Sequence, residues 1–294
     1  MTAHSPPDDS LLDNPVWHAV NGPLSRFAAP HSTSELVHFD PEVSIFSAVD
    51  RIDEATWRRI GELVGVDGFC GLFRDVVDSP PEGWEEHFRD PCWQMVAGAL
   101  PEPAGVEVVR LGPEDHAEML ALAELTEPGP FLLRTPKLGR FIGLRREGHL
   151  VAMAGERFRV PGYVEISAVC THPDARGEGL AAELTLNVAQ SIRAGGDEAF
   201  LHVLESNESA VRLYQKLGFV IRRKIDVVFC NGTDPMSHEH LANDKITDLG
   251  RIEFESSAFH CALCCLRSAR VPGGLFEEGT RQRSVCPRCG QGGS

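Results

Sequence analysis

The sequence predicts an α/β (α+β) fold, and residues 163–219 carry most of that prediction. Apolar and polar side chains alternate over Tyr163–Thr171, a period of two that is typical of a strand with two different faces. A short buried strand at Ala199–Leu204 follows, and then a helix that ends at Leu217. Between the two strands, apolar residues recur at helical spacing, namely Leu180, Leu184, Val188 and Ile192.

The N-terminal part of the chain predicts a tail and an α/β accessory domain. Residues 1–13 are acidic and are expected to form a disordered tail, and they lack the apolar core of a signal peptide. Residues 14–100 mix alternating stretches with a helical one at Asp53–Val64. Because this half contains no catalytic motif, we expect it to be an accessory domain.

A second domain is expected over residues 104–230, after a boundary that Pro101–Pro103 marks. Pro113 and the acidic residues after it suit the first turn of a helix, because carboxylates there interact favourably with the helix dipole. The remaining strands are expected at Val106–Arg110, Arg140–Arg145, Leu150–Arg159 and Val220–Cys230, the last of which closes the sheet.

A glycine-containing turn, Arg176–Ala181, separates the strand at 163–171 from its helix. Free backbone N–H groups and the positive end of the helix dipole make such a turn a binding site for phosphate or pyrophosphate. Gly177 and Gly179 allow the backbone to approach the phosphates closely, since they carry no Cβ. Taken alone, the turn is also compatible with a plain strand–turn–helix corner.

A second motif follows on the helix that ends at Leu217. The pattern Asn-x-x-Ala-x-x-Leu-Tyr-x-x-x-Gly-Phe is met by Asn207, Ala210, Leu213, Tyr214, Gly218 and Phe219. In this order the two motifs resemble those of the GNAT superfamily of acyl-CoA-dependent N-acetyltransferases. The resemblance covers residues 104–230 and implies a mixed, mostly antiparallel twisted sheet flanked by helices. Residues 14–100 are similar to the degenerate GNAT-like half of the glycine N-acyltransferase group, with an unrelated docking domain as the alternative.

The resemblance implies acetyl-CoA as the co-substrate, with its pantetheine arm along the strand at 163–171 and its phosphates on the turn. Backbone N–H groups near the end of that strand would polarise the thioester carbonyl, as an oxyanion hole does. Cys170 has no activating neighbour and is expected to be a small apolar residue. The implied cofactor-binding residues are Val169, Cys170, Thr171, Arg176, Gly177, Glu178, Gly179, Leu180, Ala181, Asn207 and Ser209.

Two side chains are the candidate catalytic groups. Tyr214 is the candidate general acid that protonates the leaving thiolate of CoA, and a packing role is the alternative. Glu165 is the candidate general base, acting through water, with a structural ion pair as the alternative and Glu156 as the second choice. His202 is expected to be a core histidine.

The C-terminal part contains two Cys-x-x-Cys knuckles, whose four thiolates suit tetrahedral Zn²⁺. The candidate zinc ligands are Cys261, Cys264, Cys286 and Cys289. We expect a zinc ribbon over residues 258–294, joined by a linker at residues 231–257. The alternative is a tail with incidental cysteines, and His260 and Cys265 are lower-ranked ligands.

The net charge of −15 argues against nucleic acid or an anionic membrane as the main partner and is compatible with a cationic amine substrate. No apolar run is long enough to span a bilayer, so a cytoplasmic location is expected. We expect an N-acetyltransferase in which an amine attacks acetyl-CoA directly in a ternary complex. Acceptor specificity is expected to lie in residues 113–138 and the loop near 160–163. The alternative is a non-catalytic acyl-CoA-binding protein that recruits a partner through the cysteine-rich tail.

Overall fold

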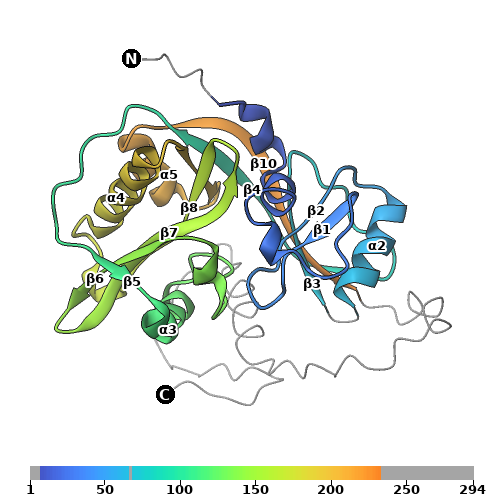
Figure 1. Ribbon diagram of the computed structural model, residues 1–294, viewed down its shortest axis with the longest axis horizontal. Helices are drawn as coiled ribbons and strands as arrows, with labels where there is room; N and C mark the ends of the chain where they lie inside the picture. The colour runs from blue at the N-terminus through green and yellow to red at the C-terminus, as the bar shows by residue number, and fades with distance from the viewer. Residues whose placement is uncertain (1–6, 66–67, 233–294) are drawn as a thin grey trace, which may run out of the picture. The chain divides into compact units, whose positions relative to one another are not determined.

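The computed structural model describes residues 7–65 and 68–232. Within these residues eight strands form one sheet, in the order β3-β10-β4-β9-β8-β7-β6-β5 (Figure 1). The strands are β3 (Phe69–Arg74), β4 (Trp84–Ala97), β5 (Val109–Leu111), β6 (Phe141–Arg146), β7 (His149–Val160), β8 (Tyr163–Thr171), β9 (Glu198–Leu204) and β10 (Phe219–Gly232). A second sheet consists of β1 (Leu36–His38) and β2 (Ser47–Val49). The helices are α1 (Pro15–Val20), α2 (Glu54–Val64), α3 (His116–Thr126), α4 (Leu180–Ala194) and α5 (Glu208–Lys216).

This architecture confirms the expected α+β fold with a mixed, mostly antiparallel sheet. Neighbouring strands of the large sheet run antiparallel except β8 and β9, which are parallel. β8 has the bounds that the alternating pattern predicts, and α4, β9 and α5 follow it in the expected order. In the described part of the chain, no helix is long and apolar enough to cross a membrane.

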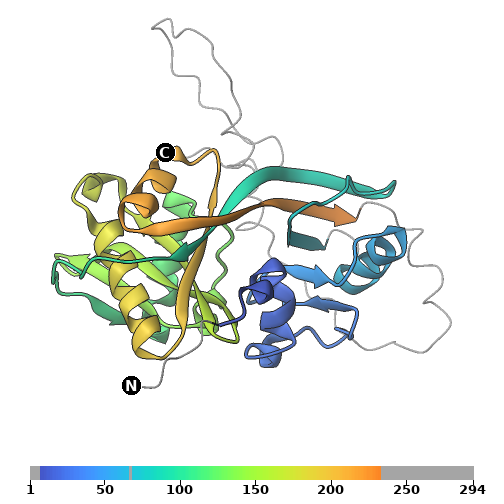
Figure 2. The same cartoon turned by 90° about the horizontal axis from the view of Figure 1, so that it is seen from above.

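Strand β4, from the N-terminal half, lies between β9 and β10, which follow the predicted boundary at Pro101–Pro103. It runs side by side with β10 from the Ala97–Phe219 pair to the Trp84–Gly232 pair (Figure 2). β3 pairs with the other edge of β10, so β10 does not close the sheet as expected. The two halves of the chain therefore share one sheet.

The expected disordered tail, residues 1–13, differs from the structure in its last part. Asp9–Asp13 form a short 3-10 helix in which Leu12 is fully buried. The carbonyl oxygen of Leu12 accepts a hydrogen bond from Gln94 Nε2 of β4 at 2.8 Å. Residues 1–6 lie outside the described residues.

Strand β8 lies between two helical layers, because α4 and α3 each pack against β7 and β8 in separate core clusters. Val164 and Ile166 belong to the cluster that contains α4. Ala168 and Cys170 belong to the cluster that contains α3. Strict alternation would keep all four side chains on one face, so the strand changes faces after Ile166.

A one-residue bulge at Ala168 causes this change of face. The partner strand β7 advances from Met153 to Gly155 while β8 runs from Cys170 back to Ser167, so β8 carries one extra residue. Ala168 has φ 52°, in the left-handed region that a residue with a Cβ adopts only at an energetic cost. The bulge therefore turns backbone groups out of the ladder.

The parallel pairing of β8 with β9 is short. It covers Tyr163–Ile166 of β8 and Glu198–Leu201 of β9. The ladder between the two strands stops at Ile166, immediately before the bulge. β8 and β9 are thus no longer paired at the position of the bulge, where the backbone of β8 leaves its regular pairing.

Candidate active site

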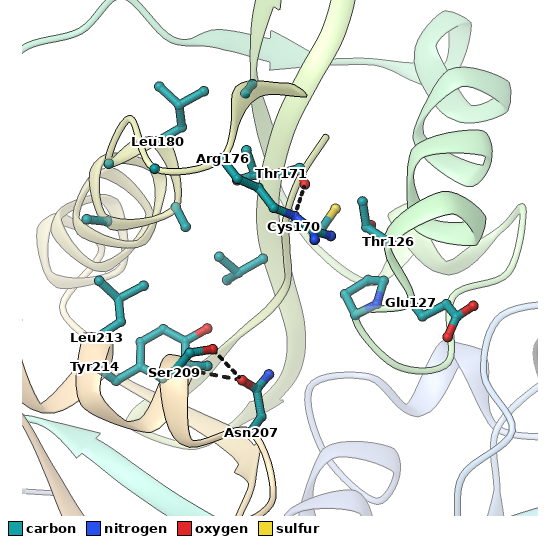
Figure 3. A pocket seen from close by; sticks show the side chains of 18 residues that line it. Thr126, Glu127, Cys170, Thr171, Arg176, Leu180, Asn207, Ser209, Leu213 and Tyr214 are labelled. Carbon is teal, nitrogen blue, oxygen red and sulfur yellow. Dashed lines mark hydrogen bonds between the residues drawn. The ribbon is translucent and has the colours of Figure 1, made fainter. Parts of the chain in front are cut away.

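A pocket of about 400 Å³ lies where β8 continues beyond its pairing with β9 (Figure 3). Its walls come from the end of β8, the turn before α4, helix α5 and the C-terminal end of α3. The predicted cofactor-binding residues that line it are Val169, Cys170, Thr171, Arg176, Gly177, Gly179, Leu180, Ala181, Asn207 and Ser209, and Tyr214 lines it as well. The structure thus brings both sequence motifs to one cavity.

The turn before α4 presents open backbone to this pocket. Gly177 and Gly179 have φ 84° and 82°, and Gly179 is the N-cap of α4 without a side-chain cap hydrogen bond. Arg176 Nε is 3.4 Å from the carbonyl oxygen of Thr171. Glu178, also predicted to contact the cofactor, is not among the lining residues, and its carboxylate pairs with the exposed Arg146.

Helix α5 places Tyr214 at the wall of the pocket, close to Ser209 and Asn207 (Figure 3). Asn207 caps the helix, because its Oδ1 accepts from the backbone N–H of Ala210 at 3.2 Å and from Ser209 Oγ at 3.0 Å. The Tyr214 hydroxyl has no hydrogen-bond partner among the described residues. Burial raises the pKa of Tyr214 above its usual value, so the phenol keeps its proton at neutral pH.

The end of β8 contributes two further groups to the pocket. Thr171 Oγ1 is buried and has no hydrogen-bond partner within residues 7–65 and 68–232. Burial raises the pKa of the Cys170 thiol to about 11, so this thiol stays protonated and behaves as an apolar side chain. The expectation that Cys170 is not an activated nucleophile agrees with this environment.

Comparison with known proteins places these features in a family. A model of FR47-like proteins matches residues 141–228. A mycothiol acetyltransferase from Thermobispora bispora is 42% identical over 66 residues, which are 22% of each chain. One from Paenarthrobacter aurescens is 35% identical over 104 residues, 35% of this chain and 31% of that protein. The chain therefore covers less than a third of the length of these curated relatives.

A solved structure of a GNAT-family protein from Novosphingobium aromaticivorans matches far more of the chain. It is 37% identical, with a TM-score of 0.70, over 76% of this chain and 99% of that one. This chain belongs to the GNAT family of acetyltransferases. A GCN5-related N-acetyltransferase from Kribbella flavida is 21% identical, with a TM-score of 0.52 over 76% of this chain and 96% of its own, and supports the fold alone.

In this GNAT protein the candidate base Glu165 does not line the pocket. Its carboxylate is fully buried and accepts hydrogen bonds from Arg157 Nε at 2.8 Å, Arg157 Nη2 at 2.6 Å and His202 Nδ1 at 2.6 Å. Burial alone would raise the pKa of Glu165, but the charge and hydrogen bonds of Arg157 lower it to about 2. These contacts match the ion-pair alternative, and the role as a base stays a prediction.

Glu156, the second choice for a base, is also outside the pocket lining. It is buried and pairs with Arg140 Nε at 3.0 Å and with Arg159 Nη2 at 3.1 Å. His202 is a core histidine, as expected: its side chain is 2% exposed, and Nε2 lies 3.0 Å from Gln94 Nε2.

The pocket also contains residues that the sequence did not indicate individually. Thr126, Glu127 and Pro128 line it from the C-terminal end of α3 (Figure 3). Glu127 is the C-cap of this helix and has a left-handed φ of 50°. The sequence indicated only the segment, because acceptor specificity was expected to lie in residues 113–138 but no single residue in it was identified.

The predicted zinc ligands Cys261, Cys264, Cys286 and Cys289 lie outside the described residues. Among the residues that the structure describes, no group of three or more His, Cys, Asp or Glu side chains could hold a metal ion. The cysteines in the described ranges, Cys70, Cys92, Cys170 and Cys230, are free and buried.

Proposed function

We propose that this protein is an N-acetyltransferase that transfers an acetyl or related acyl group from its CoA thioester to a primary amine. The pocket carries the proposal, because one cavity joins a glycine turn at a helix N-terminus, a bulged strand and a buried tyrosine. Acyl transfer from a CoA thioester needs phosphate binding, a polarised carbonyl and a proton donor together. Membership of the GNAT family supports the same reaction.

The residues present fit acetyl-CoA as the co-substrate. A Cβ built at Gly177 or Gly179 meets no atom within 4 Å, so there is open space next to the backbone of both glycines. The first N–H groups of α4 lack a side-chain cap and are available to phosphate oxygens, with Arg176 beside them. The buried, unpartnered hydroxyl of Thr171 suits an amide of the pantetheine arm.

The bulge in β8 is the proposed site of carbonyl polarisation. Backbone N–H groups beside Ala168 and Val169 would donate to the thioester oxygen, whose negative charge grows as the amine attacks. The amine forms the new C–N bond, the C–S bond breaks, and the thiolate leaves. The protonated Cys170 thiol favours this direct attack over an acyl-cysteine intermediate.

Tyr214 is the proposed general acid for the leaving thiolate. Its hydroxyl lines the pocket without a hydrogen-bond partner among the described residues, and the raised pKa of Tyr214 keeps the phenol protonated. The amine reacts in its neutral form and loses one proton to water as the C–N bond forms. Tyr214 gives one proton to the thiolate sulfur and regains one from water, so no net proton is consumed. This role makes Tyr214 the side chain whose loss should slow the reaction most.

Glu165 was proposed from the sequence as the base that deprotonates the amine, whereas its contacts favour a positioning role. A fully buried carboxylate whose pKa is lowered to about 2 takes up a proton poorly at neutral pH. We therefore propose that Glu165 orients Arg157 next to the bulged segment of β8.

We propose that the N-terminal half, residues 14–100, completes the catalytic sheet as an accessory half. Its strand β4 is inserted between β9 and β10, and its Phe46 and Phe73 rings pack against the guanidinium group of Arg157. An independent docking domain would not be expected to share a sheet with the rest of the chain, or to pack its aromatic rings against the guanidinium group of Arg157.

For the C-terminal part, the zinc ribbon at residues 258–294 and the linker at residues 231–257 remain proposals that rest on cysteine spacing alone. The cytoplasmic location likewise rests on composition. The second candidate function is a non-catalytic acyl-CoA-binding protein that recruits a partner through the cysteine-rich tail. Retention of Tyr214 in the pocket favours the enzyme.

The deciding experiment is an assay of CoA release from acetyl-CoA by the full chain, with a panel of primary amines as acceptors. Amine-dependent release, together with a mass increase of one acetyl group on the acceptor, is the expected result. If a folded protein binds acetyl-CoA but acetylates none of the amines, the non-catalytic function is the better account.

A further inference from the structure

One wall of the pocket, formed by Thr126, Glu127 and Pro128, is not used by the co-substrate as proposed (Figure 3). The end of β8, the turn before α4 and helix α5 are the walls proposed for acetyl-CoA, so an acceptor amine approaches its thioester along this remaining wall. The wall continues α3, whose core cluster is separate from the cluster that contains α4 and α5. The two substrates would therefore be held by separately packed parts of the fold.

Residues 127–138 connect α3 to β6 and extend this wall to the bulge of β8. Pro128 lines the pocket and also a small cleft, which it shares with Thr135 of the same loop and with Ala168 of the bulge. Pro128 and Pro130 have no backbone N–H, so the loop cannot donate hydrogen bonds there. The position of the loop therefore depends on contacts with other segments of the chain.

Thr135 makes one such contact with the N-terminal half. Its hydroxyl donates to the carbonyl oxygen of Val43 at 2.8 Å and accepts from the backbone N–H of Leu132 at 2.8 Å. Thr135 is 5% exposed, and Val43 is fully buried. A buried hydroxyl that is both donor and acceptor fixes the two segments, because breaking either bond would leave a polar group without a partner and without water.

Arg134, the residue before it, adds charge to the same contact. Its guanidinium group pairs with the carboxylate of Glu42 and lies 3.8 Å from that of Asp40. The side chain of Arg134 is 39% exposed, so this pair contributes less than a buried one would. Both carboxylates and Val43 belong to the loop between β1 and β2, which is therefore the part of the N-terminal half that meets the wall of the pocket.

The loop between β1 and β2 is held by hydrogen bonds of its own. Asp40 Oδ1 accepts from the backbone N–H of Glu42 at 3.0 Å, and the Asp40 carbonyl oxygen accepts from that of Val43 at 2.8 Å. After this turn, the Ile45 carbonyl oxygen accepts from the N–H of Gly71 in β3 at 2.8 Å. The large sheet thus supports the loop between β1 and β2, and this loop supports the one beside the pocket.

We propose that Thr135 and Arg134 are positioning residues through which the N-terminal half fixes the acceptor wall of the pocket. The inference rests on the proposed acetyl transfer and gives the accessory half a role besides completing the sheet. Neither side chain lines the larger pocket, so both act through Glu127 and Pro128. Breaking the contact should misplace the amine relative to the thioester while the turn at Gly177–Gly179 stays intact. A misplaced reactant loses rate even where it still binds.

The test measures acceptor kinetics and acetyl-CoA affinity separately. CoA release by the full chain is assayed with the amine that the wild type acetylates fastest, from a panel that includes benzylamine, 1,4-diaminobutane and glycinamide. Calorimetric titration with acetyl-CoA is run on every protein. Thr135→Val removes the hydroxyl at nearly constant volume and should lower kcat/KM for the amine by about 10-fold or more. The Kd of this variant for acetyl-CoA should change by less than about twofold.

Three further variants separate positioning from a loss of packing. Thr135→Ser keeps the hydroxyl and should restore most of the wild-type kcat/KM. Arg134→Gln removes only the partly exposed pair and should lower kcat/KM by about threefold in a folded protein. Arg59→Gln is the control, because Arg59 pairs with Glu35 on the surface of the same half and lines neither cavity, so this variant should match the wild type.

The outcomes distinguish this inference from the proposed function. If no amine of the panel is acetylated, the proposed function fails and the inference fails with it. If an amine is acetylated but Thr135→Val and Arg134→Gln keep the wild-type kcat/KM, only the positioning role is overturned. A Thr135→Ser variant as slow as Thr135→Val, or an equal loss of acetyl-CoA affinity, would overturn it as well. If Thr135→Val does not fold, Arg134→Gln against Arg59→Gln decides.

Discussion

Glu165 of β8 and Arg157 of β7 form a buried ion pair with two contacts, at 2.6 and 2.8 Å, close to the bulge at Ala168. His202 of β9 reaches the same carboxylate at 2.6 Å, and Gln94 of β4 lies 3.0 Å from the other ring nitrogen of His202. One network of polar side chains therefore crosses four strands and ties the N-terminal half to β8. We therefore expect the stability of the fold and the geometry of the pocket to depend on each other.

Glu165→Gln should destabilise the fold by about 3–5 kcal/mol, because it leaves the guanidinium group of Arg157 buried without its counter-ion. Urea denaturation at neutral pH measures the change. Glu54→Gln is the matched control, since Glu54 pairs with Arg58 on the exposed surface of α2 and should cost about 0.5 kcal/mol or less. Equal losses in the two variants would contradict the structural importance of the buried pair.

The ion pair between Glu165 and Arg157 also predicts how the stability of the fold depends on pH. The pKa of Glu165 is lowered in the folded state from 4.5 to about 2, so the ionised carboxylate stabilises the fold above about pH 4.5. That contribution should be lost as the pH falls from 4.5 toward 2. Glu165→Gln should show a shallower loss of unfolding free energy in this interval. Parallel curves for wild type and variant would rule out this linkage.

His38 should make the free energy of unfolding depend on pH in a second range, which lies above that of Glu165. Burial lowers the pKa of His38 from 6.5 to about 4, and its Nδ1 lies 2.7 Å from Ser47 Oγ. The unfolded chain takes up this proton first, so stability should fall between pH 6.5 and 4, by on the order of 3 kcal/mol. His38→Asn should flatten the curve there, whereas His31→Asn, at an exposed position, should not. A wild-type curve that is already flat in this range would contradict the prediction.

Tyr214→Phe should lower turnover by about 100-fold while the Kd for acetyl-CoA changes by less than about twofold, since the phenol acts on the leaving thiolate. Steady-state kinetics and calorimetry measure the two quantities. The sequence offers a matched control, because Tyr163 is its only other tyrosine and its hydroxyl donates to the Pro7 carbonyl outside the pocket. If Tyr163→Phe and Tyr214→Phe have the same activity, Tyr214 is not the general acid.

The sequence predicted the part of the fold whose signals are local. The alternation over Tyr163–Thr171 and the two motifs defined β8, α4 and α5, and those elements bring Arg176, Gly179 and Tyr214 to one pocket. Each of these signals spans a few neighbouring residues. Helix caps, glycine turns and side-chain periodicity need no knowledge of the partner strand.

The features that the sequence missed depend on contacts between distant residues. β4 carries Glu85, Glu86, Arg89 and Asp90 in its first half and contains Pro91, so its residues do not alternate like those of a strand. Its place between β9 and β10 is set by pairing across more than a hundred positions. The bulge at Ala168 likewise leaves no mark on composition, because only the register with β7 reveals the extra residue.

The prediction for Glu165 shows the same limit at the level of one side chain. Alternation correctly puts Glu165 and Ser167 on one face, since the Arg157 side chain contacts Glu165 and lines a small cleft together with Ser167. What the sequence could not reveal is that the β7–β8 hairpin places Arg157 opposite this carboxylate. An unpaired glutamate at this position suits a general base, whereas the contacts of a paired one suit the positioning role that we propose for Glu165.

The turn at Gly177–Gly179 is proposed to bind the phosphates of acetyl-CoA, and one calorimetric titration tests this binding most directly. Gly179→Glu introduces a carboxylate into the anion site, and Gly196→Glu at the other end of α4 is the control with a similar positive φ, 88° against 82°, and similar open space. We predict micromolar binding to wild type and Gly196→Glu and at least about tenfold weaker binding to Gly179→Glu. No binding to the folded wild type, or equal binding to all three proteins, would contradict the account.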